Sequence, residues 1–160
     1  MSVGRFLCGI AALIRHPDDG RYLLLRRSSG KDYGPGAWES VTGRVDQGES
    51  FSDALHREVL EEVGLRVRLD HLVGTTHFYR GAPAPENELL GVIFACTALD
   101  PQVLHTSAEH DNHRWLTAAE IEAQFPADFW LRRAIERAGL LYVHAGDVVR
   151  ERYAADGGEF

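Results

Sequence analysis

A dense group of carboxylates stands near the middle of this 160-residue chain, in the stretch GRVDQGESFSDALHREVLEEVGL at positions 43–65. Carboxylates gathered this closely are suited to binding a cation, because each one offers two hard oxygen atoms. The charged residues that matter most are one arginine and four glutamates: Arg57, Glu49, Glu58, Glu61 and Glu62.

The second half of this stretch predicts an α-helix in which two glutamates lie on the wrong face for a packing helix. At ~100° per residue, Glu58 and Glu62 fall within about 20° of Phe51, which belongs to the apolar, core-facing side. A helix built only to pack would continue that stripe with leucine or valine. Packing therefore does not explain the two carboxylates, and another function is expected for them.

The simplest alternative is a solvated acidic face in which Arg57 and Glu61 form an ordinary i,i+4 ion pair. That alternative explains this pair but not Glu58 and Glu62, which repel each other at i,i+4 near the end of the helix where the macrodipole disfavours anions. One arginine cannot balance three carboxylates and Glu49 as well. The pattern therefore favours a hard divalent metal ion with oxygen ligands.

The same stretch resembles the Nudix box, the signature of the Nudix hydrolase family. Gly43 is followed by five residues and Glu49, then by seven residues and the run REVLEEVGL at 57–65, and every fixed position of the box is matched. The resemblance implies an α/β fold, a Nudix-type α/β/α sandwich with a mixed β-sheet. It also implies hydrolysis of a nucleoside diphosphate linked to another group.

The resemblance further implies a cofactor, Mg²⁺ or Mn²⁺. In this sequence the metal ligands would be Glu58, Glu61 and Glu62, with contributions from Glu49 and the carbonyl oxygen of Gly43. Glu61 is also expected to be catalytic. In the family, the arginine at the position of Arg57 orients a metal-binding glutamate. The ion pair that Arg57 forms would therefore also be its functional contact.

A further catalytic candidate is Glu109, in the polar segment SAEHDNHRW. Nudix enzymes often carry a catalytic or metal-binding glutamate in a comparable loop, and we expect Glu109 to be the general base. His110 is the rival, because its unperturbed pKa near 6.5 suits a base at neutral pH. Glu58 and Glu61 of the box are the remaining alternatives.

Three residues are expected to bind substrate. Arg26 and Arg27 end a predicted strand beside a Gly-rich loop, where a guanidinium group could hold phosphate oxygens through two hydrogen bonds. Tyr79, in THFYR, could stack on a base, although a half-buried aromatic residue of the sheet is the simpler explanation. Trp38 is expected to belong to the core.

The elements that must position these residues follow from hydrophobic patterning and turn residues. Ser50 followed by Asp53 predicts the start of the central helix, and Gly64 predicts its end. The other predicted strands are 7–15 and 22–26 as a hairpin, 38–42, 67–79, 89–99 and 113–116. A helix capped by Thr117 and a last helix at 129–138, ended by Gly139, complete one Nudix domain at 1–143, and 144–160 is expected to be a frayed tail.

Charge, hydropathy and cysteine usage limit the partners and the cellular location that we expect. The net charge of −7 argues against a nucleic-acid polymer, which usually binds a basic surface. The apolar run at 6–14 is too short to span a membrane and predicts a buried first strand. Cys8 and Cys96 have no paired spacing, which favours reduced thiols and a cytoplasmic protein. A homodimer is expected by resemblance alone.

The expected function is Mg²⁺-dependent pyrophosphohydrolysis of a nucleoside triphosphate or a similar small triphosphate, giving a monophosphate and pyrophosphate. The segments WESVTG and SAEH resemble the dihydroneopterin triphosphate pyrophosphatase branch of the family. The alternative enzyme would hydrolyse nucleoside-diphosphate sugars or dinucleoside polyphosphates. The alternative from another class is a Nudix-fold sensor that binds nucleotides without turnover. Sensors of that kind usually lose box glutamates, and none is lost here.

Overall fold

The computed structural model describes residues 4, 6–30 and 34–156, and this part of the chain forms seven strands and four α-helices around a mixed sheet. The strands are β1 (Leu7–Arg15), β2 (Tyr22–Arg27), β3 (Trp38–Glu39), β4 (Val41–Arg44), β5 (Val67–Tyr79), β6 (Glu88–Ala98) and β7 (His110–Leu116). The helices are α1 (Phe51–Val63), α2 (Ala118–Gln124), α3 (Trp130–His144) and α4 (Asp147–Asp156). Two short 3-10 helices, η1 (Pro85–Asn87) and η2 (Pro101–Val103), lie beside β6.

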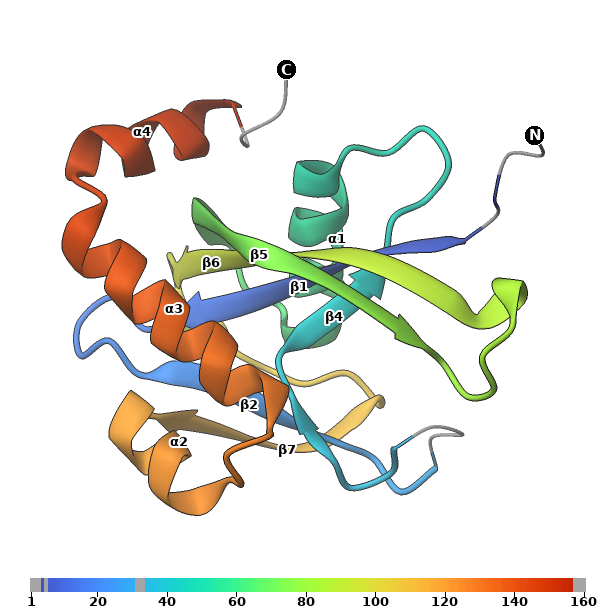
Figure 1. Cartoon of the computed structure of the whole chain (residues 1–160). Coiled ribbons are helices and arrows are strands. Elements are labelled where there is room, and N and C mark those ends of the chain that lie inside the picture. The colour runs from blue at the N-terminus through green and yellow to red at the C-terminus, as the bar shows by residue number, and fades with distance from the viewer. Residues whose placement is uncertain (1–3, 5, 31–33, 157–160) are drawn as a thin grey trace.

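Strand β1 is the centre of the sheet. It pairs in parallel with β6 along its whole length and antiparallel with β4, while β5 pairs antiparallel with β6. The predicted hairpin of β1 and β2 pairs antiparallel at Arg15 opposite Tyr22, beyond which β2 continues with β3 and β7. The sheet thus divides into two groups of strands, and both are visible in Figure 1.

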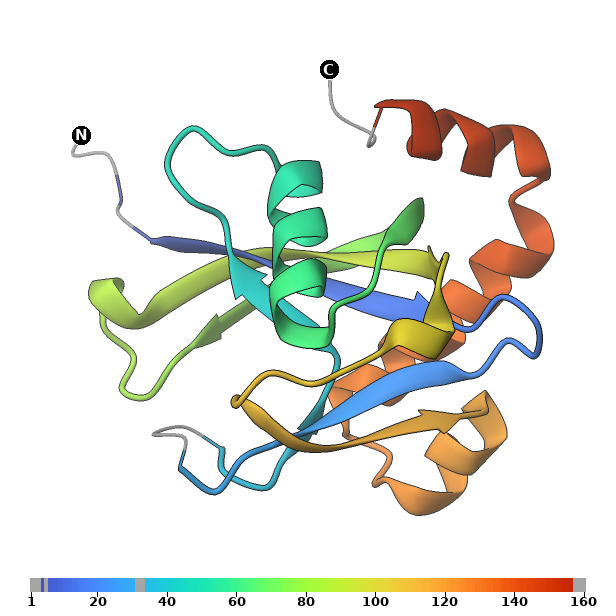
Figure 2. The same ribbon diagram turned by 180° about the vertical axis from the view of Figure 1, so that it is seen from behind.

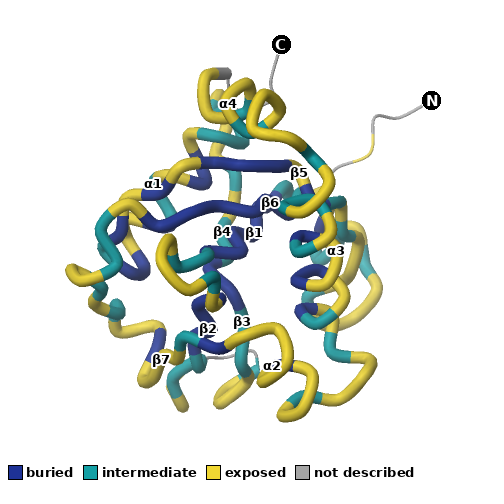
Figure 3. Tube along the Cα trace, turned by 90° about the vertical axis from the view of Figure 1, so that its left-hand side faces the viewer, coloured by how far each residue is buried: buried dark blue, intermediate teal, exposed yellow. Residues whose placement is uncertain are grey.

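The two faces of β1 are buried in separate cores, which explains its nearly continuous apolar sequence. Ile10, Ala12 and Ile14 belong to the core beneath α1, whereas Ala11 and Leu13 belong to the core beneath α3. Figure 1 shows α3 across one face of the sheet, and Figure 2 shows α1 across the opposite face. Figure 3 shows the buried strands between these two layers. The α/β/α sandwich is confirmed.

Helix α1 has the predicted boundaries, because both of its caps are local. The Ser50 side chain accepts a hydrogen bond from the Asp53 backbone N–H at 3.0 Å. Gly64 has φ 67° and donates its backbone N–H to the Leu60 carbonyl. This left-handed geometry suits glycine and stops the helix.

The structure differs from the sequence prediction at the C-terminal helices. Helix α3 continues through Gly139 to His144, because Leu141 and Tyr142 pack on the core beneath it. Where a frayed tail is expected, the chain forms α4, whose Tyr153 packs on the core beneath α1. The Arg150 guanidinium joins the two helices by donating to the Tyr142 and Ala145 carbonyls at 3.2 and 3.1 Å.

Both cysteines are free; Cys96 is buried and Cys8 is partly exposed. Burial raises the pKa of the Cys96 thiol well above its ordinary value. Within the described ranges, none of the helices is both long enough and apolar enough to cross a lipid bilayer.

Candidate active site

Gly43, the first residue of the box, lies in β4 against the side chain of Glu58 from α1. A Cβ atom added at Gly43 would come within 1.9 Å of Glu58 Cδ, far inside any real contact. Glycine at position 43 therefore leaves the space that the Glu58 side chain fills. This contact fixes the start of the box against its acidic helix.

Arg57 binds three parts of the box at once. Its Nε and Nη2 atoms donate to the two carboxylate oxygens of Glu49 at 2.8 Å each, and Nη1 donates to Glu58 Oε1 at 2.8 Å. Nη2 also donates to the carbonyl of Arg44 at 2.9 Å, and Nη1 lies 3.5 Å from Glu61 Oε2. The predicted i,i+4 pair with Glu61 is thus present, but it is the longest of these contacts.

These contacts shift the acid–base properties of both partners. Hydrogen bonds from the Arg57 side chain, and then from the Asp46 backbone, lower the pKa of Glu49 to about 2. The Glu49 and Glu58 carboxylates raise the pKa of Arg57 further above its already high value. Glu49 is therefore an anion across the whole neutral range, as both ion pairing and metal binding require.

Glu62 lies on the core-facing side of α1, as the helical wheel predicts. It is 8% exposed, whereas the side chain of Glu61 is 61% exposed. Burying a carboxylate is costly unless it is paired or binds a cation. Glu62 Oε2 lies 3.9 Å from Nδ1 of His110, the first residue of β7.

His110 is buried and connects Glu62 to the other group of strands. Its Nε2 lies 3.0 Å from Glu39 Oε1 in β3, and the Glu39 carboxylate accepts two hydrogen bonds from Arg27 Nη1 at 2.9 and 3.1 Å. Sequence reasoning missed Glu39 altogether. The available signal was an acidic residue directly after Trp38 in a segment predicted to be a strand.

Glu109 is exposed in the turn before β7, and its surroundings dock onto the site through the backbone. Its carbonyl accepts from the Ser28 N–H at 2.8 Å, and the Ser107 N–H donates to the Glu62 carbonyl at 2.8 Å. Segment 107–110 is thus held between the end of β2 and the end of α1. Glu109 therefore directly precedes His110, whose ring faces the Glu62 carboxylate.

The predicted substrate residues lie in three different places. Arg27 is half-buried and bound to Glu39, whereas Arg26 pairs with Asp111 at 2.7 Å at the partly exposed edge of β2 and β7. Tyr79 is 37% exposed at the end of β5, with its ring edge-on to His77. Since the strand order is β4, β1, β6, β5, Tyr79 lies three strands from Gly43 and four residues beyond Thr75, which is level with Gly43, so the two are on the order of 19 Å apart.

The donor set around α1 fits a hard divalent cation. Carboxylate and backbone carbonyl oxygens are the ligands such ions prefer, and Mg²⁺ commonly keeps several waters while binding only one or two protein carboxylates. Among the described residues no three His, Cys, Asp or Glu side chains are already gathered as a metal site. The contacts of Arg57 with Glu49 and Glu58 account for part of this, because they occupy two of the carboxylates.

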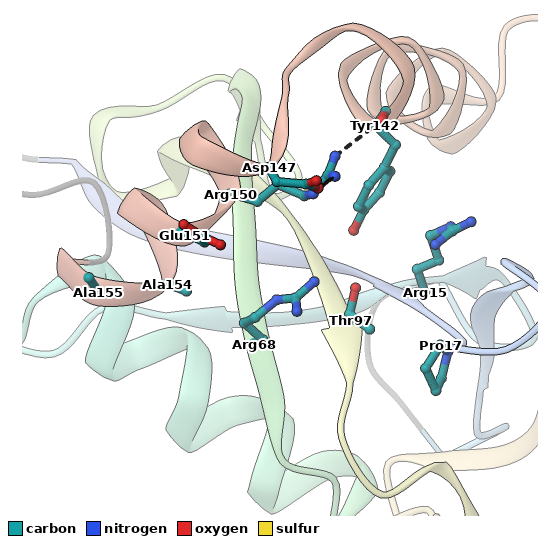
Figure 4. A pocket seen from close by; sticks show the side chains of 10 residues that line it. All are labelled: Arg15, Pro17, Arg68, Thr97, Tyr142, Asp147, Arg150, Glu151, Ala154 and Ala155. Carbon is teal, nitrogen blue, oxygen red and sulfur yellow. Dashed lines mark hydrogen bonds and ion pairs between the residues drawn. The ribbon is translucent and has the colours of Figure 1, made fainter.

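Two of the hollows on the described surface show how the predicted site residues are placed. One, of about 700 Å³, flanks the box and is lined by residues 6–8, at the start of β1, and by residues 44–51, from the end of β4 to the start of α1. The other, of about 750 Å³, lies under α4 and contains none of the predicted site residues (Figure 4). Three of the residues that line it, Arg68, Thr97 and Tyr142, donate hydrogen bonds to the buried Asp70, which ties α3 to the sheet.

Comparisons with known proteins agree with this geometry. The family model described as the NUDIX domain matches residues 8–138. An isopentenyl-diphosphate Delta-isomerase of Kocuria rhizophila is 34% identical over 131 residues, which cover 76% of this chain and 72% of that protein. The nucleoside triphosphatase NudI of Escherichia fergusonii is 27% identical over 131 residues, covering 78% and 92%.

Among solved structures, the dihydroneopterin triphosphate pyrophosphohydrolase of E. coli superimposes with a TM-score of 0.61 at 28% identity, covering 83% of this chain and 96% of that one. The complete box, its folded geometry and the match to the family model lead to one conclusion. The chain belongs to the Nudix family and is a Nudix hydrolase, an enzyme that acts on phosphoanhydride bonds.

Proposed function

We propose that this enzyme is a Mg²⁺-dependent (or Mn²⁺-dependent) pyrophosphohydrolase that cleaves a nucleoside triphosphate, or a similar small triphosphate, to a monophosphate and pyrophosphate. The observation that carries the proposal is the folded box: Arg57 holds Glu49 and Glu58 together while Gly43 leaves room for Glu58. These contacts join the loop, the strand and the helix that carry all the proposed metal ligands.

The names of two relatives support a triphosphate as substrate. One is a nucleoside triphosphatase and the other a dihydroneopterin triphosphate pyrophosphohydrolase, and the chain covers more than nine tenths of each. The hollow beside the box, of about 700 Å³, lies within the ~300–1,000 Å³ range of small-molecule sites. Nucleoside-diphosphate sugars and dinucleoside polyphosphates remain the alternative substrates.

In the proposed site, Glu58, Glu61 and Glu62 hold the metal with help from Glu49 and the carbonyl of Gly43. A bound divalent cation would neutralise phosphate charge and acidify a water molecule. Arg57 keeps Glu49 ionised and restrains Glu58 through hydrogen bonds from one rigid guanidinium group.

Proton removal from the attacking water is assigned to Glu109. Its position supports this role, because the turn that carries it is docked on α1 and remains exposed. A loop acid can move toward substrate when the site closes. His110 is less suited to this task, because its ring is buried and its Nε2 is already bound to Glu39.

Substrate contacts are proposed for Arg26, Arg27 and Tyr79. Arg26 is partly exposed at the end of β2 and could exchange Asp111 for a phosphate. Tyr79 would contact the part of the substrate farthest from the box. The binding partner is therefore a small phosphorylated molecule, and a homodimer and a cytoplasmic location stay predictions.

The test is a substrate screen with purified enzyme and Mg²⁺. The panel holds nucleoside triphosphates, dihydroneopterin triphosphate, nucleotide sugars, dinucleoside polyphosphates and isopentenyl diphosphate, the last because of the 34% identical isomerase. We expect pyrophosphate release from a triphosphate. Nucleotide sugars or dinucleoside polyphosphates turned over at least about tenfold more efficiently in kcat/KM would favour the alternative.

Two further outcomes of this screen would reject the proposal. Rearrangement of isopentenyl diphosphate without release of phosphate would place the enzyme with the isomerase relative. Tight nucleotide binding without turnover of any panel member would identify a sensor.

A further inference from the structure

A chain of buried and partly buried polar side chains runs from β2 to the acidic helix. It passes from Arg27 to Glu39, from Glu39 to His110, and from His110 to Glu62, with distances of 2.9, 3.0 and 3.9 Å between the nearest atoms. The side chains are 15%, 15%, 2% and 10% exposed in that order. Four separate elements, β2, β3, β7 and α1, contribute one residue each.

The first links fix the orientation of the His110 ring. The Glu39 carboxylate accepts from Arg27, and a carboxylate can only accept, so Nε2 of His110 is the nitrogen that carries the hydrogen. This leaves Nδ1 as the ring atom facing Glu62 Oε2. The separation of 3.9 Å is too long for a hydrogen bond, so the ring restricts the Glu62 carboxylate by packing against it.

Backbone contacts hold the same two segments together. The Ser107 N–H donates to the Glu62 carbonyl at 2.8 Å, and the His105 N–H donates to the Val63 carbonyl at 3.1 Å. A Cβ at Gly64 would lie 2.0 Å from the His105 ring, so the helix-ending glycine also makes room for this segment. Both the backbone and the side chain of Glu62 therefore contact segment 105–110.

Such packing has a direct consequence for a metal ligand. A glutamate side chain loses up to about 2 kcal/mol of conformational freedom when it is fixed. A ligand carboxylate already restrained by its neighbours loses less when a cation binds. Because about 1.4 kcal/mol corresponds to a tenfold change in an equilibrium constant, losing this restraint can weaken cation binding by up to about 30-fold.

We propose that His110 and Glu39 are positioning residues that fix the carboxylate of Glu62 for cation binding. The inference rests on the proposed function, because it assigns Glu62 to the metal site. Glu39 orients His110, and His110 limits the directions that the Glu62 carboxylate can take. Neither residue contacts the reacting phosphates in this role.

The test compares His110→Gln with His113→Gln. Both histidines lie on β7, but His113 is exposed, so its variant controls for the loss of an imidazole from this strand. Mn²⁺ affinity is measured by electron paramagnetic resonance on the protein without substrate. We expect His110→Gln to weaken Mn²⁺ binding measurably, by up to about 30-fold, and His113→Gln to leave it unchanged.

Two measurements keep the test decisive if His110→Gln does not fold. Glu39→Gln preserves the shape of its side chain and should weaken Mn²⁺ binding in the same direction. Nitrogen NMR of the histidine rings in the wild-type protein should show His110 protonated at Nε2, with Mn²⁺ broadening its signals more than those of His113.

The possible results separate this inference from the proposed function. Wild-type protein that binds Mn²⁺, together with folded His110→Gln and Glu39→Gln variants of equal affinity, would overturn the positioning role alone. A His110 ring protonated only at Nδ1 would overturn it as well. Wild-type protein that neither binds Mn²⁺ nor hydrolyses a triphosphate would overturn both.

Discussion

At the scale of single residues, one guanidinium group organises the acidic centre. Arg57 reaches Glu49, Glu58 and the Arg44 carbonyl through hydrogen bonds of 2.8 to 2.9 Å. Lysine could not make this set of contacts, because its charge is a single point rather than a planar fork. The acid–base state of the box is therefore tied to the presence of Arg57.

The pH dependence of stability should show this link. Arg57 lowers the pKa of Glu49 from about 4.5 to about 2, so the contact stabilises the fold above pH 4.5 and is lost as pH falls toward 2. We expect the difference in unfolding free energy between wild type and Arg57→Met to shrink over this interval. Urea denaturation with metal chelated measures it, and exposed Arg133→Met is the control. A constant difference down to pH 2.5 would contradict the prediction.

Residue types and spacing predicted the box, because its contacts join residues that all lie between positions 43 and 65. The Glu39–His110 contact could not be predicted in the same way, since 71 positions separate the two residues in sequence. Only the pairing of β2 with both β3 and β7 brings them together. Arg27, expected to face substrate, is bound to Glu39 for the same reason.

At the scale of elements, the contact between β4 and α1 decides where Glu58 lies. Gly43→Ala should displace the Glu58 side chain, because the new Cβ would lie 1.9 Å from its Cδ. We expect turnover to fall by ~10² with little change in the thermal midpoint, since the side chain can move aside. Gly30→Ala, where nothing lies within 4 Å of the added Cβ, is the control. Equal activity of the two variants would show that this contact is dispensable.

Element boundaries were predictable where local signals set them and not where packing did. Ser50 and Gly64 correctly predicted the start and the end of α1. Helix α3 instead continues through Gly139, because Leu141 and Tyr142 still pack on the core beneath it. Helix α4 has little amphipathic pattern, so its sequence resembles a loop.

Gly139 gives a direct test of this explanation. Its added Cβ would meet nothing within 4 Å, so Gly139→Ala should stabilise the protein by about 0.5–1 kcal/mol through the helix propensity of alanine. Urea denaturation of the two proteins at neutral pH measures the change. A loss of stability would mean that the helix is interrupted at this residue.

At the scale of the whole molecule, the cation proposed here would reduce the repulsion between the glutamates that α1 carries within two turns. Glu62 is buried, and Arg57 reaches Glu61 only at 3.5 Å. Mg²⁺ should therefore raise the thermal midpoint, by the equivalent of about 2.7 kcal/mol at a concentration 100 times its Kd. Glu62→Gln should be at least as stable as wild type in chelator and should gain less from Mg²⁺. Identical midpoints for wild type with and without saturating Mg²⁺ would contradict this.

The most direct test of the central claim is the rate of pyrophosphate release from the best triphosphate at saturating Mg²⁺. Glu61→Gln and Glu62→Gln should each lower kcat by ~10² or more while remaining folded, because charge stabilisation of this kind contributes a few kcal/mol. Glu136→Gln removes an exposed carboxylate from α3 and should match wild type. If both box variants also turn over at the wild-type rate, the carboxylates of α1 do not form the catalytic metal site.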